Sequence, residues 1–290
     1  MVLQGRTALI TGASQGLGRA IAQEYLKAGA SVVLVSRGRE QLAQTAEELR
    51  AGVTSPDQKL ITLPGDVGNF DDCDRIVAFA EKELGHLDVL VNNAGVYGPI
   101  GRFEELDWDA WVEAFTINFL GLARLCRAAI PIFRRQGSGK IINLSGGGAT
   151  APLPRFSSYA GSKSAVVRLT ETLAHELQGD GIDINAIAPG ALNTRLLDDV
   201  LAAGPEKVGR EFYEKSLKQR DSGGTAPERG AALAVFLASR ASDGITGRLL
   251  SAVWDDWANL PNVRDALAAT DIFTLRRITP EDRGGLRRCA

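Results

Sequence analysis

Short apolar runs alternate with amphipathic stretches of helical length along most of this chain. The runs rich in leucine or β-branched residues are expected to form strands at residues 7–11, 31–36, 59–63, 87–92, 140–145, 182–187 and 248–252. Helical patterns lie between them, at residues 16–28, 39–50, 70–84, 108–135, 157–178 and 227–239. Such alternation predicts an α/β fold, a doubly wound parallel sheet of about seven strands with helices on both faces.

The strand pattern stops after Ala252, which suggests where the main domain ends. The chain has 290 residues, and α/β folds often run to about 250 residues without a division. We therefore expect residues 1–252 to form the catalytic domain and residues 253–290 to pack on it or on a neighbouring subunit, since Trp and Arg are common anchors. Alternatively, Trp254 and Trp257 with the acids between them bind a hydroxylated ligand such as a sugar.

Charge and cysteine usage narrow the class of partner. A formal net charge of −2 gives no broad attraction to nucleic acid or to anionic membranes. Met1 leads almost directly into the first strand, and no stretch approaches the ~20 apolar residues of a membrane span. Cys73, Cys126 and Cys289 are widely spaced, as expected for reduced thiols. These features predict a cytoplasmic protein with a small-molecule partner.

A glycine-rich turn joins the first strand to the first helix. Its sequence is Thr11-Gly12-Ala13-Ser14-Gln15-Gly16-Leu17-Gly18. Glycines there allow a tight turn and let the backbone approach a pyrophosphate, which then meets the unpaired N–H groups of the helix N-terminus. We therefore expect a Rossmann-like dinucleotide site that uses Gly12, Ser14, Gln15, Gly16, Leu17 and Gly18.

The ends of the second and third strands bear on the choice of dinucleotide. Ser36-Arg37 follows the second strand, with no acid to hold the ribose 2′-hydroxyl of NAD. Ser36 and Arg37 suit the 2′-phosphate of NADP, so NADP is the expected cofactor and NAD the alternative. Asp66-Val67 ends the third strand, where it is expected to meet an adenine edge, or else Asp66 caps the next helix.

Tyr159 and Lys163 lie four residues apart in a segment with a helical pattern. That spacing puts both side chains on one helix face, so the ammonium lies beside the phenol. A neighbouring cation favours the phenolate, and lowering the pKa of a phenol by about 3 units takes roughly 4 kcal/mol of differential stabilisation. The pair therefore predicts proton transfer near neutral pH.

These motifs, in this order, resemble those of the short-chain dehydrogenase/reductase family over about residues 5–250. The shared pattern comprises the glycine turn, Asn92-Asn93-Ala94-Gly95, Asn118, the strand end at Ser145, Tyr159-x-x-x-Lys163 and Pro189-Gly190. The resemblance implies hydride transfer between NAD(P) and a carbonyl or secondary alcohol, with Tyr159 as general acid or base. Lys163 would lower the pKa of Tyr159 and bind the nicotinamide ribose.

The resemblance also implies roles for other positions. Asn93, Ala94 and Gly95 would support the sheet and contact the cofactor. Asn118 would hold a water of the proton relay, although a buried, core-bonded asparagine is the alternative. The loop after the sixth strand would pass the nicotinamide through Pro189, Gly190, Leu192 and Thr194.

The chain departs from the family at the active-site serine. Relatives place it thirteen residues before the tyrosine, where this chain has Gly146, whereas Ser145 lies fourteen before. The glycines that follow would let the loop bring the Ser145 hydroxyl to the substrate carbonyl. Otherwise Tyr159, a backbone N–H or Ser157 would polarise the substrate carbonyl. One such hydrogen bond contributes about 3 kcal/mol to a transition state.

The substrate itself is not specified by the sequence. Pocket walls are expected from residues 150–158 and from the charged, lid-like segment 192–219, where Arg155 or Arg195 would hold an anion or simply be solvated. The long helices at residues 108–135 and 157–178 predict a homodimer or homotetramer. A catalytically idle NAD(P)-binding scaffold is the competing function. A nucleotide-sugar epimerase is disfavoured by the glycine spacing and by the chain's size.

Overall fold

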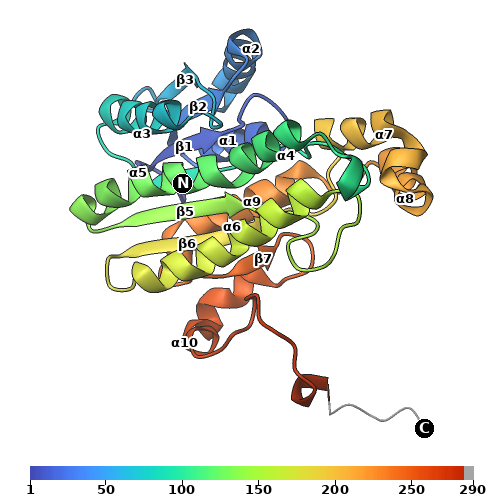
Figure 1. The fold of residues 1–290 in the computed structure, drawn as a ribbon. Coiled ribbons are helices and arrows are strands. Elements are labelled where there is room, and N and C mark those ends of the chain that lie inside the picture. The colour runs from blue at the N-terminus through green and yellow to red at the C-terminus, as the bar shows by residue number, and fades with distance from the viewer. Residues whose placement is uncertain (284–290) are drawn as a thin grey trace.

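The computed structural model describes residues 1–283 and contains one seven-stranded, wholly parallel sheet (Figure 1). The strand order is β3-β2-β1-β4-β5-β6-β7. The strands are β1 (Thr7–Thr11), β2 (Ser31–Ser36), β3 (Leu60–Pro64), β4 (Val89–Asn92), β5 (Gly139–Leu144), β6 (Ile182–Ala188) and β7 (Leu249–Ser251). The predicted Rossmann-like α/β fold is confirmed, and each predicted strand appears within about two residues of its expected bounds.

Helices cover both faces of the sheet, which explains why the strands are apolar on both sides. One face packs on α1 (Gly16–Lys27), α2 (Arg39–Leu49) and α9 (Pro227–Ala238). The other packs on α3 (Phe70–Leu84), α5 (Gly121–Gln136) and α6 (Ser157–Glu176). Figure 1 shows α5 and α6 in front of the strands and α1 and α9 behind them.

The long helix predicted at residues 108–135 is divided by a wide turn. It consists of α4 (Trp108–Phe115), a π-helical turn (Thr116–Leu120) and α5. Residues 108–136 form a helix that meets the length and composition of a membrane span, contrary to the expectation that no stretch would. Its α5 part buries Leu125 and Phe133 in the core between the sheet and α3, as a core helix does.

Two helices form a lid at the carboxyl end of the sheet. They are α7 (Arg195–Val208) and α8 (Arg210–Ser222), which pack against each other and lie together beyond the tips of the strands (Figure 1). α7 is kinked at Gly204, whose φ is +78°, and Gly209 joins the two helices at φ +88°. Both angles lie in the left-handed region that glycine tolerates.

The segment after β7 lies along that edge strand. The Leu249 N–H donates to the Phe273 carbonyl at 2.8 Å, and Trp257 packs on Phe236 of α9. Trp254 is 86% exposed. A further helix, α10 (Arg264–Ala268), lies in this segment. Short helical turns complete the described part at Arg50–Gly52, Phe103–Glu105, Arg240–Ser242, Trp257–Val263 and Glu281–Arg283. Cys289 and the last two arginines, Arg287 and Arg288, lie outside the described residues.

Candidate active site

A cavity of about 680 Å³ opens at the carboxyl end of the central strands. Most of the residues expected to bind cofactor or substrate line it: Gly12, Ser14, Gln15, Gly16, Leu17, Ser36, Arg37, Asp66, Val67, Asn93, Ala94, Gly95, Ser145, Tyr159, Lys163, Pro189, Leu192 and Thr194. Three others, Gly18, Asn118 and Gly190, are not in the cavity wall. The sheet thus brings together side chains from positions 12 to 194 of the chain.

The glycine turn is held in place from the neighbouring strand. Asn93 Nδ2 donates to the carbonyls of Thr11 (2.9 Å) and Gly12 (3.0 Å), and the Asn93 N–H donates to Thr11 Oγ1. A side chain at Gly18 would overlap both the Gly12 carbonyl and the Asn93 amide. Gly18 is therefore required for packing behind the turn, and Asn93 supports the turn as well as lining the cavity.

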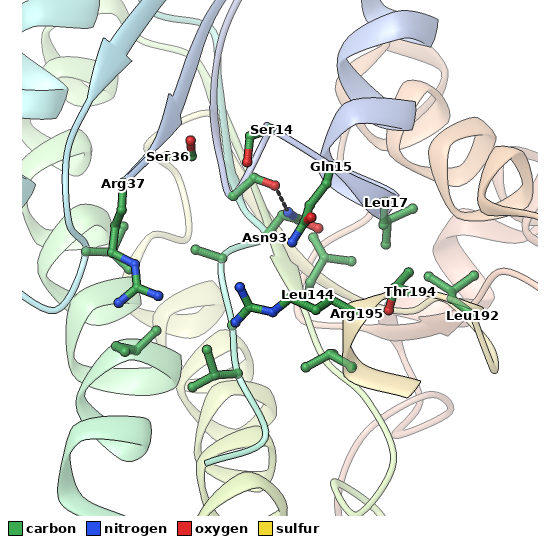
Figure 2. Close-up of a pocket in the computed structure, with 18 of the residues that line it drawn as sticks. Ser14, Gln15, Leu17, Ser36, Arg37, Asn93, Leu144, Leu192, Thr194 and Arg195 are labelled. Atoms are coloured by element: carbon green, nitrogen blue, oxygen red, sulfur yellow. Dashed lines mark hydrogen bonds between the residues drawn. The ribbon is translucent and has the colours of Figure 1, made fainter. Parts of the chain in front are cut away.

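Polar groups at the second strand end lack partners. The Ser36 hydroxyl is buried with no hydrogen-bond partner in the described part of the chain, and Arg37 is exposed beside it in the cavity wall. Figure 2 shows both side chains on one side of the cavity. A buried hydroxyl without a partner is costly and is explained by a ligand that supplies one.

Asp66 does not cap the following helix. Asn69 is the N-cap of α3, accepting from the N–H groups of Asp71 (2.9 Å) and Asp72 (3.1 Å). The Asp66 carboxylate accepts instead from the Gly68 N–H at 2.8 Å. Because Asn69 supplies the cap, that alternative for Asp66 is wrong, and Asp66 stays in the cavity wall with Val67.

Tyr159 and Lys163 lie on one face of α6 at the cavity. Lys163 Nζ is 5.7 Å from the Tyr159 ring centroid and donates to the Leu144 carbonyl at 2.7 Å. The Tyr97 ring packs edge-on against Tyr159 with centroids 4.6 Å apart. The spacing predicted from the sequence therefore places the two groups side by side.

Burial changes the pKa of both groups. It raises the pKa of the Tyr159 phenol, with Tyr97 adding a smaller rise, and it lowers the pKa of Lys163 to about 8. The expected net lowering of the phenol pKa is not met in this structure, because loss of hydration opposes the charged form of the phenol and outweighs the cation beside it.

Asn118 lies in the π-helical turn, fully buried. Its Nδ2 donates to the Val96 carbonyl (2.8 Å) and to Ser162 Oγ (3.1 Å), while its Oδ1 accepts from the Val96 N–H (2.8 Å). Both amide hydrogens are therefore used within the protein. The side chain joins the loop after β4 to α6, as the buried-asparagine alternative describes.

Ser145 directly follows β5, and its hydroxyl is buried without a partner in the described residues and lines the cavity. At the next position, a Cβ on Gly146 would overlap the Tyr159 hydroxyl. In this structure the tyrosine hydroxyl thus lies where a side chain at 146 would lie. Ser157, the alternative donor, accepts a hydrogen bond from Trp111 Nε1 at 3.0 Å.

The loop after β6 connects the cavity to the lid. The Thr225 N–H donates to the Ala191 carbonyl (2.7 Å), and Gln219 of α8 donates to the Leu192 carbonyl (3.2 Å). Gly190 packs against Thr225 and Val253, with no room for a Cβ atom. Gly190 therefore shapes the loop, while Leu192 and Thr194 reach the cavity (Figure 2).

An apolar cluster beside Tyr159 includes residues that sequence reasoning missed. It contains Tyr97, Ile100, Leu153, Phe156, Val200, Ala203, Val208, Phe212 and Tyr213. Leu153 and Phe156 come from the expected wall at residues 150–158. Val200, Ala203, Val208, Phe212 and Tyr213 come from the expected wall at residues 192–219. Tyr97 and Ile100 were missed, although they lie in the loop that follows β4. Arg155 has a φ of +75°, which is unusual for arginine.

A doubly wound parallel sheet, a glycine turn opening α1 and a Tyr–Lys pair at the same cavity define a class: nucleotide-dependent oxidoreductases. The short chain dehydrogenase family model matches residues 6–203. The chain therefore belongs to the short-chain dehydrogenase/reductase family, as its motifs predicted.

Two curated relatives illustrate the likeness. A short chain dehydrogenase of Pseudocercospora fijiensis is 36% identical over 220 residues, covering 74% of this chain and 70% of the relative. The 3-oxoacyl-acyl-carrier-protein reductase of Thermotoga maritima is 33% identical over 260 residues, covering 86% of this chain and 97% of the relative.

Two solved structures share the fold. Levodione reductase superposes with a TM-score of 0.78 at 28% identity, covering 86% of this chain and 96% of that one. A short-chain alcohol dehydrogenase of Sinorhizobium meliloti superposes with a TM-score of 0.75 at 30% identity, covering 86% and 95%. The family membership supports oxidoreductase activity with a nicotinamide cofactor.

Proposed function

We propose that the protein is an NADP(H)-dependent dehydrogenase or reductase that interconverts a carbonyl and a secondary alcohol. The observation that carries this proposal is the convergence of Tyr159, Lys163 and Ser145 on the cavity that the glycine turn also lines. A phenol, an ammonium and a hydroxyl around one point suit proton transfer to a carbonyl oxygen.

The residues present fit a nicotinamide dinucleotide. The glycine turn leaves the backbone accessible to phosphate, and the unpartnered Ser36 hydroxyl with Arg37 offers hydrogen bonds and charge to a 2′-phosphate. When bound, the nicotinamide supplies or accepts the hydride. NAD is the alternative, because Arg37 is exposed and could stay solvated beside the 2′-hydroxyl that NAD has in place of the 2′-phosphate.

The chain's own groups handle the proton. During reduction, Tyr159 donates its hydroxyl proton to the carbonyl oxygen as the carbonyl carbon gains hydride, and Ser145 donates a hydrogen bond to the same oxygen. The Lys163 ammonium stabilises the phenolate that remains. During oxidation the phenolate takes the proton back. The Ser145 role rests on its buried, unpartnered hydroxyl at the strand end.

Two measurements on wild type and Tyr159→Phe test this function. NADPH binding by fluorescence should be similar in both, whereas turnover on a panel of ketones, aldehydes and secondary alcohols should fall by about 10²–10⁴-fold in the variant. Binding without turnover by wild type on the whole panel would favour the competing function, an idle NADP-binding scaffold.

Cofactor choice has its own test. Arg37→Ala should weaken NADPH binding about tenfold and leave NADH binding unchanged, because an arginine–phosphate contact of about 1.4 kcal/mol is lost. Equal loss for both cofactors would contradict the assignment of Arg37 to the 2′-phosphate.

We also propose a homodimer or homotetramer in the cytoplasm. Trp108 is 60% exposed and stacks on Trp111, and Val112 of α4 and Leu120 of the π-helical turn are also exposed. A second copy would cover these side chains. The buried, free thiols of Cys73 and Cys126 suit a reducing compartment. Light scattering that shows a monomer at micromolar concentration would refute the oligomer.

A further inference from the structure

Arg195 is a cation of the lid that reaches into the cofactor cavity. It is the first residue of α7, it lines the cavity, and its side chain is exposed. Figure 2 shows it extending across the cavity below Ser14 and Gln15 of the glycine turn, toward the side where Arg37 lies. Within residues 1–283 it forms no ion pair or side-chain hydrogen bond, so its charge is free to meet an anion.

The start of the lid is already close to the glycine turn. A Cβ atom on Gly16 would lie 3.2 Å from Thr194 Cγ2, so the residue before Arg195 abuts the turn from the opposite wall. Arg220 of α8 also lines the cavity, but it is paired with Asp221 at 2.9 Å. Arg195 is therefore the unpaired lid cation opposite the backbone that suits a pyrophosphate.

We propose that Arg195 binds the diphosphate of the dinucleotide and thereby fixes the lid on the bound cofactor. This inference rests on the proposed function and adds to it a residue that neither the glycine turn nor the Tyr–Lys pair includes. A guanidinium presents two parallel N–H donors to a phosphate, which suits it to this contact better than an ammonium.

The lid is held at two places, and neither involves Arg195. α7 and α8 pack on each other, and Phe212 of α8 packs on Phe156 beside the cavity, with ring centroids 5.0 Å apart. Gln219 and Asn193 tie the base of the lid to the loop after β6. A bond from Arg195 to the cofactor would therefore add a third restraint, on the first turn of α7 from the cavity side.

Binding measurements with three ligands locate the contact. NADPH, NADH and ADP-ribose all carry the diphosphate, but only NADPH carries the 2′-phosphate and ADP-ribose has no nicotinamide. In Arg195→Ala the Kd should rise about tenfold for all three, and Arg195→Lys should restore part of the loss. The control Arg210→Ala, in the same lid but paired only with Glu206 and outside the cavity wall, should bind like wild type.

Hydrogen exchange provides a second readout. NADPH should slow amide exchange across residues 195–222 in wild type and less so in Arg195→Ala at saturating NADPH. Loss confined to NADPH would overturn the proposal by placing Arg195 at the 2′-phosphate, and unchanged Kd values would overturn it outright. In both cases wild-type binding would leave the proposed function standing, whereas no dinucleotide binding by wild type would overturn both.

Discussion

Two serine hydroxyls in the wall of the cavity and the buried guanidinium of Arg248 at the β7 edge differ in their hydrogen-bond partners. Two of the five buried side-chain atoms without a hydrogen-bond partner in the described residues are the hydroxyls of Ser36 and Ser145, both in the cavity wall. At the β7 edge, Arg248 is buried but donates to the carbonyls of Leu267, Thr270 and Ile272 at 2.7 to 2.9 Å.

That difference distinguishes polar groups that a ligand can reach from polar groups that stabilise the fold. The Arg248 guanidinium donates to carbonyls of its own chain, so it needs no ligand. The two serine hydroxyls gain a partner only from outside the chain. The two hydroxyls are therefore available to a ligand in the cavity, whereas the Arg248 guanidinium is not.

Among the substitutions that test this difference, the largest effect should come from Ser145→Ala. If its hydroxyl polarises the substrate carbonyl, kcat should fall about 10²–10³-fold while the Kd for NADPH stays unchanged. Steady-state kinetics and cofactor titration measure the two quantities. A kcat within threefold of wild type would show that another donor polarises the carbonyl and that the Ser145 hydroxyl has no role in turnover.

Gly146→Ser adds a hydroxyl to the same part of the cavity wall, whereas Ser145→Ala removes one. It restores a serine at the family's position, yet its Cβ would overlap the Tyr159 hydroxyl, so we expect kcat to fall about 10²-fold through misplacement of the phenol. Gly147→Ser is the control, because its Cβ would lie 3.9 Å from Leu153 Cδ2. Increased turnover by Gly146→Ser would show that Tyr159 moves aside readily.

Arg248→Met tests the stabilising role of the buried guanidinium at the β7 edge. Losing hydrogen bonds to three carbonyls should lower the free energy of unfolding by about 2–3 kcal/mol, with the Kd for NADPH unchanged. Urea denaturation and cofactor titration measure these quantities, and the exposed Arg229→Met serves as control. A changed Kd for NADPH with an unchanged free energy of unfolding would show that Arg248 serves cofactor binding and not stability.

The smallest effect concerns pH. Burial lowers the pKa of Lys163 to about 8, so its charge is present below that pH and lost above it. We expect kcat/KM for carbonyl reduction to fall severalfold as pH rises through about 8, since the phenolate then lacks its cation. Ser145→Ala should be slower but keep the same midpoint. A flat profile to about pH 9.5 would show that Lys163 stays charged.

Local pattern predicted most of the fold but only part of the site. Strands such as residues 31–36 are apolar throughout because helices cover both faces, so they were visible in the sequence. The Tyr159–Lys163 contact follows from helical periodicity alone. The π-helical turn at Asn118 was not visible, because a helical pattern does not reveal one extra residue in a turn.

Contacts between distant segments account for the rest. The packing of Tyr97 on Tyr159, the overlap between position 146 and the phenol, and the pairing of Leu249 with Phe273 all depend on tertiary placement. The rise in the pKa of Tyr159 belongs here too, because its burial is set by residues that the spacing of the Tyr–Lys pair does not include. Sequence spacing places groups together but does not fix their hydration.

The most direct test of the central claim follows the hydride itself. NADPH with both C4 hydrogens of the nicotinamide replaced by deuterium is incubated with the protein and a ketone that the substrate panel shows to be reduced. Wild type should place deuterium on the alcohol carbon, and Tyr159→Phe should bind the labelled cofactor but form alcohol about 10²–10⁴-fold more slowly. Unlabelled alcohol from wild type, or equal transfer by Tyr159→Phe, would contradict the account.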